Sequence, residues 1–449
     1  MGGKLRSTNN MRIVTGKFGQ RFYNFFLIAI PTLFFLMNIY MGLPITSRFI
    51  INDFIIGCSI VSLIGMALLC IKKQFKCFNY SHKKYYLLIM LLVVLNASFV
   101  YGVLSGNVMI FHLYFLVVEE VCFFVLILIY ENENELFWTG LKVLEFIIFC
   151  TAIYGIFEYI TKYNIIEAWF NPLMPYKLFG SWEDFRVQAI YRNPIPASHV
   201  FIIAFWFPFF GEKKLSYKAV RNIVYLAAII LCKERTEWIA FILTLLIYLM
   251  ISNKSHEVRE HILEIWNKKT TFWKIVIIII MLVFLTYIIS EISSRFIFSG
   301  LTSSEAFIVR SSRIRFFFDS VLPSTGLIEL LFGRGFESSI TLIDAANLPV
   351  DRYDCFENGY LTIFTEYGCL VLVCVLCLFV KGVKFIIDNK NKIGSNNSKC
   401  AFGVLVSIIP ILSYDTDKYH GVLFLILISF ITIAGSIKNV GTSNKSNIV

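Results

Sequence analysis

Apolar stretches of about 20 residues recur along this chain and alternate with short polar connections. A helix of about 20 apolar residues is long enough to cross the hydrocarbon core of a bilayer. Twelve stretches fit this description, near residues 22–42, 49–71, 85–104, 110–130, 141–160, 195–211, 219–232, 237–252, 273–291, 358–380, 400–414 and 421–437. The seventh and eighth are short, because the polar sequence CKERTEW lies between them. The pattern predicts an all-α polytopic membrane protein with about twelve transmembrane helices.

The predicted helices form one transmembrane domain over residues 22–437, flanked by polar tails at 1–21 and 438–449. Two connections on one side of the membrane are long, about 161–194 and 292–357, whereas the others on that side are a few residues each. Long connections in compact proteins usually carry function. We therefore expect the chemistry in these two segments, and we expect short helices in the second.

The amino-acid composition also indicates a membrane protein. Hydrophobic residues make up 57% of the chain and charged residues only 16%, which is unusual for a soluble domain. The one Cys-x-x-Cys pattern, Cys374 to Cys377, falls in the middle of a predicted span. We interpret these cysteines as small core residues rather than a metal or redox site. No nucleic acid partner is expected.

Basic residues are distributed unequally between the two sides of the predicted domain. The side that holds both termini carries 27 of the 41 Lys and Arg residues, and the other side carries 14. Cytoplasmic connections are enriched in these residues, so we expect both termini in the cytoplasm. The inner set is 22 Lys and 5 Arg, but the outer set is 4 Lys and 10 Arg. Because a planar guanidinium binds phosphate through two hydrogen bonds, the outer arginines indicate phosphate recognition.

Arg235 lies in the sequence CKERTEWIAF, at the outer end of the eighth predicted span. Thr236 is suited to cap that helix, and Glu237 is expected in its first turn. A helix N-terminus presents free N–H groups and a partial positive charge, so Arg235 beside it favours an anion site. The alternative is that Arg235 pairs with Glu234 or reaches the lipid headgroups.

The second long connection holds VRSSRIRFFFDSVLPSTGLIELLFGRGF. Ser311 or Ser312 is expected to cap a short amphipathic helix that ends near the following proline. Arg310 and Arg313 are three residues apart and share a face of this helix, whereas Arg315 is turned away from Arg313. The three phenylalanines after Arg315 indicate a helix in the membrane interface. The arginines therefore bind either a phosphorylated substrate or headgroup phosphates.

Two short motifs suggest phosphate or metal chemistry only weakly. Asp415 and Asp417 form an Asp-x-Asp pattern that can hold a divalent ion, but such short matches are common and no metal is expected. Gly333-Arg334-Gly335 lacks the strand-to-helix context of a nucleotide loop, so a turn is expected there.

Four further polar residues lie in or near predicted spans. His199 stands near an outer helix start, as a base or as a polar group at a helix end. Glu119 and Glu120 fall mid-span, where each charge costs about 2.5–3.5 kcal/mol, so at least one should face the bundle interior. This pair favours a transporter. Glu366 lies nine positions after Glu357 and is expected to join an internal network or to stay neutral.

Three pieces of sequence occur in order: KERTEWIAF, then SSRIRFFFDSVL with LFGRGF, then ENGYLTIFTEYG at the tenth predicted span. With YRNPIPAS, they resemble the superfamily of O-antigen ligases and Wzy-type polysaccharide polymerases over roughly residues 190–380. Members carry Ser-Arg at a helix start, an outer-loop Arg followed by aromatics and Gly-x-Gly, and His-Asn-x-Tyr-Leu before a late span. Here KERT replaces Ser-Arg and Glu357 replaces the ligase His. The second difference favours a polymerase.

The resemblance implies glycosyl transfer at the outer face of the bacterial cytoplasmic membrane. The donor is a glycan on undecaprenyl pyrophosphate, and the acceptor is a sugar hydroxyl of the next lipid-linked repeat unit. It assigns Arg235 and Arg313 to the leaving pyrophosphate and Glu357 to the proton of the acceptor hydroxyl, with no cofactor. Other expected partners are membrane lipid and a chain-length regulator. Further substrate-binding residues are Arg192, Arg310, Arg315, Asn358 and Tyr360.

Three alternatives remain open. An O-antigen ligase of the same superfamily differs only in its acceptor, and the product could equally be O-antigen or capsule. A lipid-linked glycan transporter or flippase fits Glu119 and Glu120, but it does not explain the outward concentration of Arg. Glycosyltransferases that use polyprenyl monophosphate sugars resemble one another in an acidic first outer loop, and here that loop, GLPITSR, has no acid.

Overall fold

The computed structural model describes residues 86–106, 134–165, 185–191, 194–209, 214–252, 305–335, 338–346, 356, 358–388 and 395–412. In these residues the regular secondary structure is helical and contains no strand. The helices are α4 (Tyr86–Leu104), α6 (Asn134–Thr161), α8 (Pro194–Ala204), η1 (Phe207–Phe209), α9 (Leu215–Leu231), α10 (Arg235–Ser252), α13 (Glu305–Phe316), η2 (Phe317–Val321), α14 (Leu327–Phe332), α15 (Ser338–Ala345), α16 (Gly359–Asp388) and α18 (Ser395–Leu412). The prediction of an all-α protein is confirmed for this part of the chain.

Two helical stretches, Lys142–Thr161 and Gly359–Asp388, are long and apolar enough to cross a membrane. Five other predicted spans coincide with α4, α8 and η1, α9, α10 and α18, and all of these except α9 contain a shorter apolar stretch. The count of twelve spans is not established. The remaining predicted spans, near 22–42, 49–71, 110–130, 273–291 and 421–437, and both tails lie outside the described residues.

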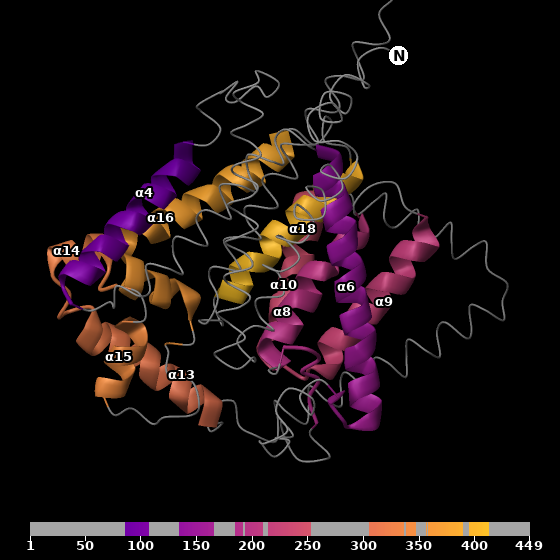
Figure 1. The fold of residues 1–449 in the computed structure, drawn as a ribbon, viewed down its shortest axis with the longest axis horizontal. Coiled ribbons are helices and arrows are strands. Elements are labelled where there is room, and N and C mark those ends of the chain that lie inside the picture. Colours follow the sequence, from indigo (N-terminus) through magenta and orange to yellow (C-terminus); the bar gives the residue numbers. More distant parts are fainter. Residues whose placement is uncertain are drawn as a thin grey trace, which may run out of the picture.

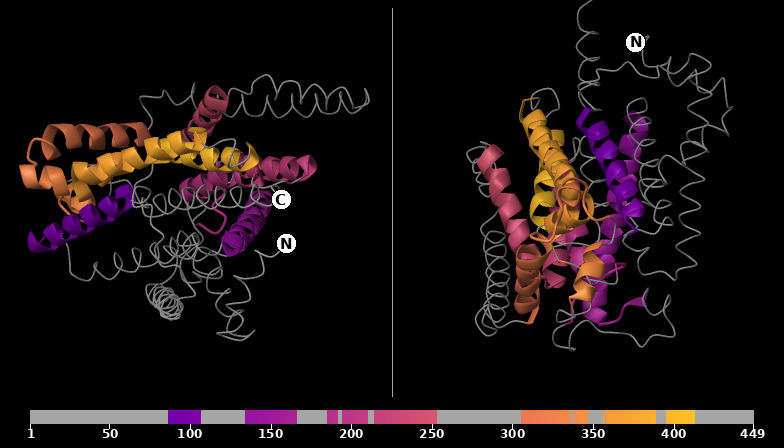
Figure 2. Two further views of the ribbon diagram at one scale, coloured as in Figure 1. Left: turned by 90° about the horizontal axis from the view of Figure 1, so that it is seen from above. Right: turned by 90° about the vertical axis from the view of Figure 1, so that its left-hand side faces the viewer.

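The described helices form two groups, which α16 and α18 join (Figures 1 and 2). In one group, α4, α14 and α15 pack against α16. In the other, α6, α8 and α9 pack together, and α18 packs against α8 and α10. Because α16 contacts both α4 and α18, it links the two groups.

Helix ends that are predicted to face outward lie close together. The N–H of Val187 donates to the carbonyl of Leu231 at the end of α9, at 3.1 Å. The Tyr360 hydroxyl, near the start of α16, donates to the carbonyl of Ile409 near the end of α18, at 2.7 Å. α13 and α15 lie toward the lower side of Figure 1.

α16 is not one continuous helix, although its sequence predicts an unbroken span. It breaks at Gly368, where φ is 81° and ψ is 176°. The break frees the carbonyls of Thr365 and Glu366 from their helical partners. These carbonyls accept the N–H groups of Arg334 at 2.8 Å and Gly335 at 3.0 Å. The turn predicted around Arg334 is confirmed, and it caps the first half of α16.

Two glycines make this close approach possible. Gly333 and Gly368 both have positive φ, 78° and 81°, which side-chain-bearing residues rarely adopt. A Cβ on Gly333 would overlap the backbone of Glu366, and a Cβ on Gly368 would overlap the backbone of Leu331. Irregular backbone within an apolar bundle is tolerated where the surrounding protein satisfies it, and here the residues after α14 do so.

The second group is fixed on α18 by Trp206, which is 1% exposed. Its indole N–H donates to the Ser407 hydroxyl at 2.9 Å, and that hydroxyl donates to the Gly403 carbonyl at 2.7 Å. The Trp206 ring lies directly against Gly403, where an added Cβ would overlap it. This contact joins the end of α8 to α18.

Candidate functional site

Arg235 is the first residue of α10, and Glu237 lies in the first turn, as predicted. The expected cap by Thr236 is wrong, because the helix begins one residue before it. The carbonyl of Glu234 already accepts the N–H of Trp238 at 3.2 Å, which places Thr236 inside the helix. Arg235 therefore stands at a helix N-terminus, and its side chain lies outside the described part of the structure.

The turn before α10 carries a net positive charge. Lys233 has a positive φ of 54°, and Glu234 pairs with Arg186 at 2.9 Å. The bases here are Arg186, Lys233 and Arg235, and the acids are Glu234 and Glu237, so the net charge is +1 without His199. Together with the partial charge of the helix N-terminus, this balance favours an anionic group near Arg235.

The chain that leads to Arg192 is held by a buried carboxylate. Glu158, near the end of α6, has no exposed surface. It accepts the N–H of Ala189 at 2.7 Å, the N–H of Gln188 at 3.4 Å and the side-chain amide of Asn164 at 3.1 Å. The sequence analysis did not identify Glu158, although an acid near the end of an apolar span was the available signal. Arg192 itself lies outside the described residues.

His199 and Glu237 form a buried pair between α8 and α10. Nε2 of His199 lies 2.7 Å from Oε1 of Glu237, which is a hydrogen-bond distance. His199 is 5% exposed, and Glu237 has no exposed surface. Oε2 of Glu237 is buried and has no hydrogen-bond partner within the described residues. His199 was identified from sequence, but its pairing with Glu237 was not.

Two further hydroxyls are buried in the chain segment that leads to His199. Ser198 on α8 has no exposed surface, and Tyr191 is 3% exposed. Neither hydroxyl has a partner among the residues that the structure describes. Burial raises the pKa of Tyr191 above its usual range, with a smaller contribution from Tyr225. The Tyr191 hydroxyl is therefore protonated at neutral pH and can donate a hydrogen bond.

Arg313 and Arg315 differ sharply in exposure. Arg313 has no exposed surface, whereas Arg315 is exposed, as their spacing predicts. Arg310 lies on the same helix, and its side chain is outside the described part. The expected cap by Ser311 or Ser312 is wrong, because α13 begins at Glu305 and both serines lie within it. An acid suits the first turn of a helix, which explains the earlier start.

An aromatic cluster joins the end of α13 to the start of α16. Phe317 stands one turn after Arg313 and on the same face. Its ring centroid lies 5.6 Å from the ring of Phe356 and 5.6 Å from the ring of Phe364. Phe356 has no exposed surface and directly precedes Glu357 in the sequence. Phe317 therefore joins the residues that follow α13 to the start of α16, and the buried Arg313 precedes Phe317 by four residues.

Asn358 and Tyr360 both contribute to the structure at the start of α16. The side-chain oxygen of Asn358 accepts the N–H of Leu361 at 3.1 Å, which makes Asn358 the cap of the helix. The Tyr360 hydroxyl donates a hydrogen bond to the Ile409 carbonyl of α18. Glu357 immediately precedes the cap but lies outside the described residues.

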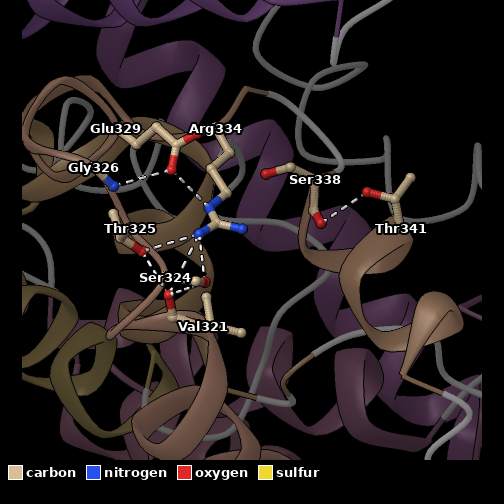
Figure 3. Close-up of polar contacts among 8 residues, drawn as sticks. All are labelled: Val321, Ser324, Thr325, Gly326, Glu329, Arg334, Ser338 and Thr341. Carbon is tan, nitrogen blue, oxygen red and sulfur yellow. Dashed lines mark hydrogen bonds and ion pairs between the residues drawn. The ribbon is translucent and has the colours of Figure 1, made fainter.

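Arg334 stabilises the segment between α13 and α14 (Figure 3). Its Nη2 donates to the Ser324 hydroxyl at 3.0 Å, to the Thr325 hydroxyl at 3.2 Å and to the Val321 carbonyl at 3.4 Å. Its Nε lies 3.3 Å from the carboxylate of Glu329. These contacts give Arg334 a structural role.

Glu366 is buried in the first half of α16 and accepts a hydrogen bond from the Ser339 hydroxyl of α15. Its backbone carbonyl also accepts a hydrogen bond from Ser98 of α4, at 3.3 Å. The expectation that Glu366 joins an internal network is confirmed. The network ties α4 and α15 to the first half of α16.

Among the described residues, no group of three His, Cys, Asp or Glu side chains is arranged to hold a metal ion. Asp415 and Asp417 lie outside the described residues, as do Glu119 and Glu120. The structure therefore buries Arg313 in α13, and it places Arg235 at the N-terminus of α10, two residues before the Glu237 that contacts His199 of α8.

Comparison with models of known protein families gives no match for this chain, and comparison with characterised proteins gives no significant match.

Proposed function

We propose that this protein is a membrane-embedded glycosyltransferase that polymerises lipid-linked oligosaccharide repeat units. It transfers the growing glycan from undecaprenyl pyrophosphate to a sugar hydroxyl of the next unit, at the outer face of the cytoplasmic membrane. The observation that carries the proposal is the complete burial of Arg313 in α13. A guanidinium that binds lipid headgroups must reach the membrane surface, but Arg313 has no exposed surface. The alternative that Arg313 only binds headgroup phosphates is therefore disfavoured.

In the proposed reaction, the bond between the anomeric carbon of the donor glycan and the pyrophosphate oxygen breaks. The electron pair leaves with the pyrophosphate, where negative charge develops. Arg235 at the α10 N-terminus and Arg313 stabilise that charge in a site with little water. Arg192, Arg310 and Arg315 supply additional positive charge.

The acceptor hydroxyl forms the new glycosidic bond and loses its proton to Glu357. The neighbours of Glu357 in the sequence support this role, because Asn358 caps α16 and Phe356 is held in the aromatic cluster. The residues on both sides of Glu357 are thus fixed in the structure. Tyr360 contributes by joining the start of α16 to α18.

A lipid-linked glycan transporter is the second candidate, because broken helices often mark binding sites in transporters. α16 has such a break at Gly368. However, the freed carbonyls of Thr365 and Glu366 are bound by the backbone of Arg334 and Gly335. Protein groups therefore satisfy the break, which argues against a transport path there. A ligase of the same superfamily would share the site and differ in the acceptor.

Two substitutions in cells separate the polymerase from the transporter. Glu357→Gln keeps the size of the side chain and removes the base, so cells should accumulate single repeat units. Glu119→Gln should retain most polymer, because the proposed chemistry lies at the outer face. The opposite result would be loss of polymer in Glu119→Gln and normal polymer in Glu357→Gln, with both proteins present in the membrane at normal level. It would rule out the polymerase hypothesis in favour of the transporter.

A further inference from the structure

The helix that carries Arg313 continues past its end as a π-turn. α13 leads directly into η2, which covers Phe317–Val321. The N–H of Leu322 donates to the carbonyl of Phe317, five residues earlier, at 2.8 Å. π-turns are rare and often occur at functional sites. This one begins one helical turn after the buried Arg313, so its geometry bears on the proposed site.

The π-turn affects how three buried residues line up along one face of the helix. Arg313, Phe317 and Val321 are spaced four apart, and each is at most 3% exposed. In an α-helix, residues spaced by four drift about 40° around the axis at each step, because one turn takes 3.6 residues. A π-turn takes more residues per turn and offsets this drift. The direction of Arg313 relative to Val321 therefore depends on the π-turn between them.

The carbonyl of Val321, at the end of the π-turn, accepts three side-chain donors. They are the hydroxyls of Ser324 at 2.9 Å and Thr325 at 2.7 Å, and Nη2 of Arg334 at 3.4 Å. The same Nη2 also donates to both hydroxyl oxygens, at 3.0 and 3.2 Å (Figure 3). Arg334 thus binds the last carbonyl of the π-turn together with the two side chains that bind it.

The π-turn is attached to the first half of α16 at both of its ends. At its start, the Phe317 ring lies 5.6 Å from the ring of Phe364, measured between centroids. At its end, Val321 is bound by the side chain of Arg334, whose backbone N–H donates to the carbonyl of Thr365 at 2.8 Å. One attachment is aromatic and direct, and the other passes through Arg334.

We propose that Arg334 is a positioning residue for the glycosyl transfer: it holds the π-turn on the first half of α16 and thereby orients Arg313. This inference rests on the proposed function, which assigns Arg313 to the leaving pyrophosphate. The Arg334 side chain is only 16% exposed, and its Nε and Nη2 are engaged by residues of the segment 321–329. Arg334 therefore acts through the helix of Arg313 and not on the substrate.

Arg334→Lys is the first variant, because it keeps the charge and the backbone N–H that binds Thr365 but loses the planar guanidinium. Turnover is measured with the purified full-length protein in liposomes, supplied with purified lipid-linked repeat units of the cell's own glycan. kcat should fall about 10- to 100-fold, because a displacement of about 1 Å in a catalytic group can cost that much. KM should change less than about threefold, since the substrate contacts remain.

Ser324→Ala combined with Thr325→Val weakens the same attachment and leaves Arg334 itself unchanged. kcat should fall about 3- to 30-fold, again with little change in KM. This variant also decides the question if Arg334→Lys does not fold. Arg221→Lys is the matched control, because the Arg221 side chain is similarly buried, at 12% exposed, and pairs with Glu145 of α6. It should keep the kcat of the unmodified protein.

A double variant gives a readout that a general structural role would not produce. If Arg334 acts through Arg313, its substitution matters little once Arg313 is already changed. Adding Arg334→Lys to Arg313→Lys should therefore lower kcat by less than about a further twofold. Two residues that act independently would instead multiply their separate losses.

Four results would overturn the inference. They are full activity of Arg334→Lys, a loss confined to KM, full activity of the Ser324 and Thr325 variant beside a slow Arg334→Lys, and multiplied losses in the double variant. Each leaves the proposed function standing, because the unmodified protein still lengthens the glycan. If the unmodified protein makes no polymer under these conditions, the proposed function fails, and the inference fails with it.

Discussion

Replacement of Gly368 by alanine tests the break in α16. At φ 81° and ψ 176°, an alanine is strained by about 1–3 kcal/mol. Its Cβ would also overlap the Leu331 backbone and lie 2.6 Å from the Gly333 nitrogen. Backbone atoms cannot move aside as a flexible side chain can, so the total cost should reach about 4 kcal/mol or more. This is a large share of the roughly 5–15 kcal/mol that stabilises most proteins.

Gly106→Ala is the matched control, because it introduces the strain of a positive φ without an overlap between the added Cβ and neighbouring atoms. Gly106 has nearly the same φ, 76°, but no neighbouring atom lies within 4 Å of an added Cβ. The control should lose only about 1–2 kcal/mol. Thermal unfolding of the purified variants, followed by size-exclusion chromatography of the protein that remains soluble in detergent, provides the comparison. If Gly368→Ala unfolds at the same temperature as Gly106→Ala, the account of α16 and its capping turn is refuted.

Three further predictions concern the site and its place in the membrane. Arg313→Lys should lower the polymerisation rate at least about hundredfold, since an ammonium does not reproduce the guanidinium fork, whereas Arg221→Lys at the other end of the helices should retain activity. A reporter that is active only outside the cytoplasm should be active when fused near residue 340 and silent near residue 390, and the reverse would overturn the location of the site. Activity of the purified protein should survive EDTA, and loss that magnesium restores would instead assign a metal to Asp415 and its neighbours.

Helices were the most predictable feature, because an apolar stretch of sufficient length needs no knowledge of its neighbours. The predicted 85–104 span matches α4, Tyr86–Leu104, almost residue for residue. The 3.6-residue helical repeat also predicted that Arg313 and Arg315 point in different directions, and Arg313 is buried whereas Arg315 is exposed. Helix starts were less predictable: Thr236 and the two serines of α13 are good caps by residue type, but the helices begin earlier.

Features that depend on distant residues could not be predicted. The break at Gly368 is stable because the turn around Arg334, more than 30 positions earlier, binds the carbonyls that it frees. The sequence of α16 alone is mostly apolar and predicts one span. Likewise His199 and Glu237 lie 38 positions apart, and only the packing of α8 on α10 brings them together. Each of the two residues could be noted from the sequence, but their contact could not be predicted.

The most direct test of the central claim is reconstitution of the purified full-length protein in liposomes with lipid-linked repeat units as the only substrate. The account predicts a ladder of lengthened lipid-linked glycans, with one molecule of undecaprenyl pyrophosphate released for each new glycosidic bond. Repeat units that cross the liposome bilayer without any lengthening, and without release of the pyrophosphate carrier, would contradict glycosyl transfer and indicate transport.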